Sequence, residues 1–97
     1  MRLYVSGPVT GMELLNRPAF ERAGRRLEAA GYDVLLPHWF VPSGADWERA
    51  MRACVETLVK CDGVALLPGW GGSRGAKLER RLALALGMEV RREDLWR

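Results

Sequence analysis

The sequence predicts an α/β protein, in which strands and helices alternate along one chain of 97 residues. Apolar, β-type runs occur at residues 2–6, 33–37 and 63–67. After each run, directly or across a loop, apolar residues recur at helical spacing. Glycine and proline gather at the junctions, where they mark turns. This alternation indicates a parallel sheet with right-handed crossovers.

The first strand, residues 2–6, leads into a turn rich in glycine and proline at residues 7–11. We expect Asn16 to cap the first helix, with Pro18 in its first turn. Four apolar residues then recur at helical spacing: Phe20, Ala23, Leu27 and Ala30. Gly31 suits the left-handed position that ends such a helix.

The second strand, residues 33–37, is followed by a loop at residues 38–45. Asp46 is the expected cap of the second helix. The apolar positions of this helix are Trp47, Ala50, Met51, Cys54, Leu58 and Cys61. The pattern therefore predicts an amphipathic helix between the second and third strands.

The third strand, residues 63–67, runs into a glycine-rich turn and then a helix over residues 76–86, which Gly87 ends. Residues 88–90 form a possible fourth strand. We expect a minimal three-layer sandwich of the flavodoxin-like or Rossmann-like type, with strand order 2-1-3-4 and about three helices. One domain spans residues 1–97.

This strand order places the carboxyl ends of the first and third strands side by side, at the switch point where ligands bind. The two glycine-bearing turns, residues 7–11 and 68–75, are therefore expected to face one cleft. Glu79 follows the second turn by about one helical turn. A carboxylate beside an anion-binding turn indicates chemistry on a phosphorylated or sugar-bearing small molecule.

Composition narrows the function classes. Hydrophobic residues make up 48% of the chain, and no run approaches the ~20 apolar residues of a membrane span. The N-terminus enters a strand pattern without a signal-peptide layout, so the cytoplasm is the expected compartment. Cys54 and Cys61 lie too far apart along one helix for a disulfide. With one histidine, the chain has no zinc-ligand cluster.

The net charge is +3, and arginine supplies most of the cations. The arginines of the predicted helices are interleaved with glutamates. These arginines are Arg22, Arg25, Arg26, Arg49, Arg52, Arg80 and Arg81. This distribution favours solvated helix faces and an anionic small ligand over a nucleic-acid surface. A domain of this size has apolar surface to cover, so a homo-oligomer is expected, and Trp96 in the tail is a candidate subunit contact.

Three motifs occur in order: YVSGPVTG at residues 4–11, CDGVALLPGW at residues 61–70, and SRGAKLE at residues 73–79, with LALALG after it. Together they resemble the nucleoside 2-deoxyribosyltransferase-like superfamily, and most of all its small DUF4406-type branch of unknown function. The resemblance covers residues 2–90. It implies attack of a glutamate on C1′ of the sugar, loss of the base, and transfer of the sugar to another base or to water, without metal or cofactor.

The resemblance implies that Glu79 is the nucleophile and that Tyr4 orients it. The residues expected to bind a nucleoside or a nucleotide 5′-monophosphate are Gly7, Pro8, Thr10, Gly11, Ser73 and Gly75. Trp39 and Trp70 follow the carboxyl ends of strands and could stack on a nucleobase. They could equally cover a small core or an interface. Glu79 could also be a solvated helix carboxylate, and Tyr4 an ordinary strand aromatic.

One position departs from the superfamily pattern. The family commonly has an aspartate eight residues before the aspartate that begins the third strand, and the count back from Asp62 gives Cys54. The general acid is then Glu48, His38 or a group from a neighbouring subunit. Two functions remain open: an N-glycosyl hydrolase or deoxyribosyltransferase, and a nucleotide-binding module that uses the same cleft without catalysis.

Overall fold

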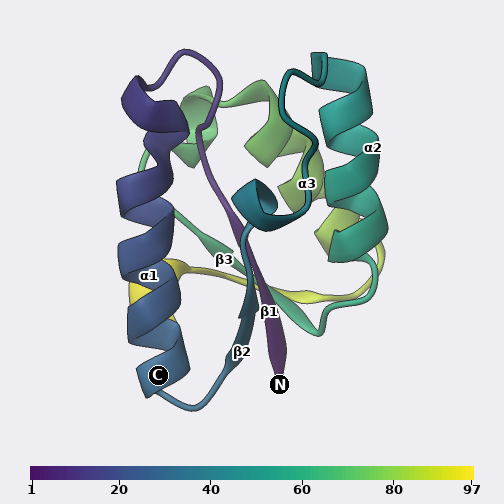
Figure 1. Cartoon of the computed structure of the whole chain (residues 1–97). Helices are drawn as coiled ribbons and strands as arrows, with labels where there is room; N and C mark the ends of the chain where they lie inside the picture. The colour runs from purple at the N-terminus through teal and green to yellow at the C-terminus, as the bar shows by residue number, and fades with distance from the viewer.

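The computed structural model describes residues 1–97 and shows three layers (Figure 1). The strands are β1 (Arg2–Ser6), β2 (Asp33–Leu35), β3 (Gly63–Leu66) and β4 (Glu89–Arg92). The α-helices are α1 (Arg17–Ala29), α2 (Trp47–Leu58) and α3 (Arg74–Ala85). All strand pairs are parallel, in the order β2-β1-β3-β4. The predicted fold class and strand order are confirmed.

Short 3₁₀ turns shift some of the predicted boundaries. They are η1 (Glu13–Asn16), η2 (Pro37–Trp39), η3 (Trp70–Gly72) and η4 (Glu93–Leu95). Strand β2 ends at Leu35, because Pro37 begins η2 and has no N–H to give to a sheet ladder. Strand β4 lies one to two residues later than expected, because its pairing with β3 extends to Arg92.

Local capping signals are mostly confirmed. The Asp46 side chain accepts from the Arg49 N–H at 2.8 Å, and Gly31 follows α1 with φ 99°. Asn16 is an exception, because it stands at the N-cap position before α1 but makes no side-chain cap. Its Nδ2 instead donates to the Pro8 carbonyl at 2.9 Å, so its side chain fixes the turn after β1.

Alternation along β1 sends its side chains to the two faces of the sheet. Leu3 and Val5 join the core under α1, whereas Tyr4 joins the core under α2 and α3. The two cores lie on opposite sides of the strands (Figure 1). None of the helices has the length and hydrophobicity needed to cross a lipid bilayer.

The C-terminal tail is part of the core, which corrects the expectation that Trp96 contacts a partner subunit. Trp96 is 2% exposed and packs in the core under α1. Its Nε1–H donates to the Val64 carbonyl at 3.0 Å. The tail is held further by the Arg26–Glu93 ion pair at 2.8 Å and by a Tyr32 hydroxyl that donates to the Arg97 carbonyl. It therefore covers β3 on the face where α1 is the only helix.

Truncating the buried indole should cost far more stability than truncating its exposed neighbour. We expect Trp96→Ala to lower the free energy of unfolding by about 3–5 kcal/mol, because it opens a cavity in the core. The matched variant Leu95→Ala removes a side chain that is 45% exposed, and should change it by about 0.5 kcal/mol or less. Urea unfolding followed by circular dichroism measures both, and equal losses would contradict a structural role for the tail.

Candidate active site

A buried carboxylate lies where β1 and α3 meet. Glu79, in the second turn of α3, is 4% exposed. The Tyr4 hydroxyl donates to Glu79 Oε2 at 2.5 Å, and the Ser6 hydroxyl donates to Oε1 at 2.7 Å. Each carboxylate oxygen therefore has a hydroxyl donor from β1. This geometry excludes the interpretation of Glu79 as a solvated helix carboxylate.

The surroundings change the acid–base properties of this cluster. Burial raises the pKa of Glu79 above its ordinary value of 4.5, while hydrogen bonds from Tyr4, Ser6 and Cys54 partly offset the rise. Burial and the nearby Glu79 charge raise the pKa of Tyr4 well above 10.0. Tyr4 therefore stays protonated and keeps its donor role, which orients the carboxylate.

Cys54, on α2, completes this cluster. It is 7% exposed and interacts with both Tyr4 and Glu79. Burial raises the pKa of its thiol to about 11. The thiol is thus neutral at physiological pH, and it occupies the position at which the resemblance described above implies an acid.

A cleft of about 530 Å³ opens over Glu79 at the carboxyl end of the sheet. The predicted site residues that line it are Tyr4, Gly7, Thr10, Gly11, Ser73, Gly75 and Glu79. The Ser73 hydroxyl caps α3 by accepting from the Ala76 N–H at 3.2 Å. A Cβ at Gly7 would lie 2.7 Å from the Cβ of Leu67, so only glycine lets the turn after β1 pass so close to the end of β3.

The family model described as "Domain of unknown function (DUF4406)" matches residues 1–92. The chain belongs to the DUF4406 family. The match covers β1, α2 and α3, and with them every residue of the Glu79 cluster. No curated protein matches the sequence significantly.

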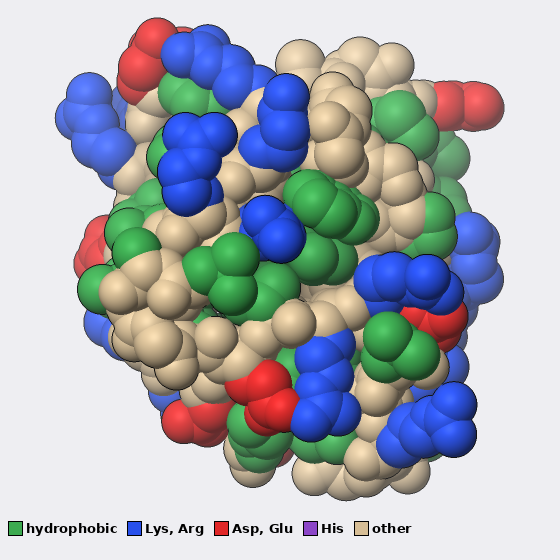
Figure 2. All heavy atoms as spheres, turned by 180° about the vertical axis from the view of Figure 1, so that it is seen from behind, with side chains coloured by type: hydrophobic (Ala, Val, Ile, Leu, Met, Phe, Trp, Pro, Cys, Tyr) green, Lys and Arg blue, Asp and Glu red, His purple; other side chains and the backbone are tan.

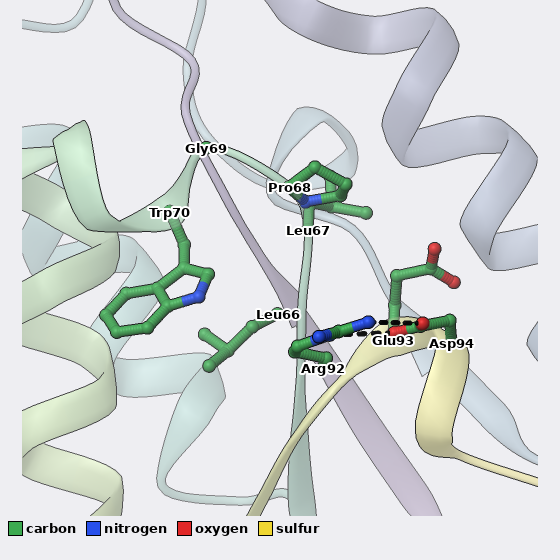
Figure 3. Close-up of a pocket in the computed structure, with 8 residues that line it drawn as sticks. All are labelled: Leu66, Leu67, Pro68, Gly69, Trp70, Arg92, Glu93 and Asp94. Atoms are coloured by element: carbon green, nitrogen blue, oxygen red, sulfur yellow. Dashed lines mark hydrogen bonds and ion pairs between the residues drawn. The ribbon is translucent and has the colours of Figure 1, made fainter.

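The structure leaves three predicted residues of this DUF4406 chain outside the cleft lining: Pro8, Trp39 and Trp70. Trp39 is 54% exposed in η2. Trp70 lines a separate hollow of about 390 Å³, together with Leu66 and Arg92 (Figure 3). Arg92 and Asp94 both line that hollow and form an ion pair with each other. The two glycine turns therefore only partly share one cleft, because the first half of the second turn faces the hollow.

Sequence reasoning missed Ser6, Arg17 and Trp47. Ser6 lies two residues after Tyr4 in the same strand, so the period of two could have placed both hydroxyls on one face. Trp47, at the start of α2, lines the cleft and carries the Arg74 guanidinium 3.7 Å from its ring centroid. Trp47 is thus the tryptophan that the cleft contains. Arg17, at the start of α1, also lines the cleft.

The candidate acids differ in their position. Glu48 is exposed and does not line the cleft. His38 does line it, but its Nε2 lies 2.8 Å from the Leu15 carbonyl and its ring packs edge-on against Phe20. Its Nδ1 is buried and has no hydrogen-bond partner. No three His, Cys, Asp or Glu side chains gather in a way that could hold a metal ion.

The raised pKa of Glu79 predicts a pH-dependent stability. The carboxyl binds its proton more tightly in the folded than in the unfolded chain, so the stability it contributes is complete below about 4.5 and is lost as the pH rises through the folded-state pKa. We expect the unfolding free energy of the wild type, relative to Glu79→Gln, to fall over this window. Urea titrations at a series of pH values measure this difference in unfolding free energy. A difference that does not change with pH would show that Glu79 has the same pKa in the folded and the unfolded chain.

The two hydroxyls should also set the pKa of Glu79 itself. Tyr4→Phe and Ser6→Ala each remove a donor that lowers this pKa, so each should raise it further. The ¹³C chemical shift of the labelled Glu79 carboxyl, followed against pH, measures the change. Thr57→Val is a matched control, because the Thr57 hydroxyl bonds to the Ala53 carbonyl within α2. A pKa that does not move in either site variant would contradict the hydrogen-bonding scheme.

Proposed function

We propose that this DUF4406 chain hydrolyses or transfers the N-glycosidic bond of a nucleoside or a nucleotide 5′-monophosphate, with Glu79 as the nucleophile. The observation that carries the proposal is a buried carboxylate, held by two hydroxyl donors, at the floor of a cleft. Such a carboxylate can trap the oxocarbenium-like centre at C1′ as a covalent glycosyl-enzyme. The resemblance of three motifs to nucleoside 2-deoxyribosyltransferases supports the same reaction.

The rest of the cleft fits a small ligand that carries an anionic group. Ser73 begins α3, and the free N–H groups of a first helical turn favour an anion such as a 5′-phosphate. Arg17 adds a cation to the lining, and Trp47 adds an aromatic ring, one face of which holds the Arg74 guanidinium. Seen from behind, Lys and Arg side chains are dispersed among apolar and acidic ones (Figure 2). That dispersal supports a small ligand over a nucleic-acid strand.

A second candidate is a module that binds a nucleotide in the same cleft and leaves it intact. The observation that favours it is Cys54, because a thiol with a pKa of about 11 replaces the expected acid beside Glu79. This candidate predicts saturable nucleotide binding by calorimetry, with unmodified ligand recovered afterwards. Free base after long incubation would exclude it.

The glycosidic function is tested by incubating the protein with nucleosides, deoxynucleosides and their 5′-monophosphates, followed by chromatography for free base. We expect base release by the wild type and a loss of at least about 10³-fold in Glu79→Gln, because the variant has no nucleophile. Glu56→Gln, an exposed change on α2, is the matched control and should retain activity. Base release that persists in a folded Glu79→Gln protein would refute the mechanism.

A further inference from the structure

Five titratable side chains line the cleft: Tyr4, Arg17, His38, Cys54 and Glu79. In the proposed reaction Glu79 attacks C1′, so within this chain only the other four line the cleft as potential proton donors to the departing base. A neutral nucleobase leaves as an anion unless it is protonated. Whether one of these four can protonate it therefore decides which leaving groups the site can use.

The two neighbours of Glu79 are poor proton donors. The Tyr4 hydroxyl is already committed to Glu79 Oε2. Burial, and in Tyr4 also the Glu79 charge, keep the pKa of Tyr4 well above 10.0 and raise that of Cys54 to about 11. An efficient general acid has a pKa near the working pH. Neither hydroxyl nor thiol meets that condition.

The two remaining groups are also unsuited. His38 Nε2 faces the Leu15 carbonyl, and its Nδ1 is closed off from solvent and hence from the open cleft. Arg17 carries a guanidinium, which serves proteins as a fixed cation and not as a general acid, and it pairs with Glu21 at 3.6 Å. Every titratable group that faces the cleft is thus unable to supply the proton in this geometry.

Resting on the proposed function, we propose that the cleft acts on N-glycosides whose base is already cationic, such as N7-alkylated purine or pyridinium nucleotides. Glu79 Oε forms a bond to C1′, and the C1′–N bond breaks with its electron pair going to the ring nitrogen. That pair cancels the positive charge, so the base leaves neutral without a proton. Water then attacks C1′, frees Glu79 and releases its proton to solvent. The anionic carboxylate at the floor of the cleft also favours a cationic ligand.

A matched substrate pair tests this inference: 7-methylguanosine 5′-monophosphate, assayed below neutral pH so that N1 keeps its proton, is cationic in its base, and guanosine 5′-monophosphate differs by one methyl group. We expect the protein to release 7-methylguanine at least about 10²-fold faster than guanine, since general acids usually contribute about 10²–10⁴-fold. Nicotinamide mononucleotide serves as a second, pyridinium probe. The rate measured with Glu79→Gln is subtracted from the wild-type rate, because cationic nucleosides also hydrolyse spontaneously. A reaction without protein measures that spontaneous rate separately.

Variants at Cys54 give an independent readout on the same pair. Cys54→Asp places a carboxyl where the thiol lies, and should narrow the rate ratio by accelerating guanine release. Cys54→Asn has nearly the same shape but no acid, and should keep the ratio. Because both readouts are ratios between two substrates in one protein, a general loss of stability does not imitate the result.

The possible failures are distinguishable. Similar rates for the two guanosine nucleotides, or release from neutral nucleotides while both cationic probes stay intact, would overturn the leaving-group inference and leave the glycosidic function standing. If neither the neutral panel nor the cationic probes release base above the Glu79→Gln background, the proposed function fails and the inference fails with it.

Discussion

The interaction on which the site depends is the burial of the Glu79 carboxylate against two hydroxyls of β1. Removing a carboxylate from water costs several kcal/mol, and each hydrogen bond to a charged group returns about 1.5–3 kcal/mol. Tyr4 and Ser6 together offset much of that cost, and the raised pKa shows that part of it remains. The same two bonds tie α3 to the central strand β1. They therefore fix both the position of the Glu79 carboxylate and the packing of α3 against the sheet.

Topology explains why these groups meet. In the order β2-β1-β3-β4, the chain reaches α3 directly from the strand beside β1, which brings the second turn of α3 over the end of β1. The period of two along β1 then sends both hydroxyls to that face and the alternate apolar residues to α1. Gly7 allows the close passage of the two strand ends. On the other face of β3, where α1 is the only helix, Trp96 helps to close the core.

Features that are encoded locally could be predicted, and those that depend on distant contacts could not. Periodicity and caps such as Asp46 predicted the elements and their order. The glycine-rich turn drew attention to Glu79, and the resemblance of the three motifs to a known superfamily pointed to Glu79 and Tyr4 together. Asn16 occupies the N-cap position, but its side chain makes no cap, because its backbone is left-handed (φ 58°) and not in the extended conformation of a capping residue. A tryptophan after a strand end can turn to either side, which is why the sequence could not place Trp70 in the second hollow. The tail has no apolar periodicity from which the burial of Trp96 could have been predicted.

Cys54 connects the electrostatics of the site to its chemistry. An aspartate at this position would put a second carboxylate beside Glu79, and two carboxylates that share a buried site force one pKa strongly upward. The neutral thiol avoids this repulsion and contributes a weak hydrogen bond, which lowers the pKa of Glu79. With Cys54 at this position the ionised form of Glu79 is favoured more than it would be beside a second carboxylate, and in the proposed reaction that ionised form is the nucleophile. If the proposed function holds, the same cysteine that leaves the site without the expected acid also keeps Glu79 closer to the form that the proposal requires.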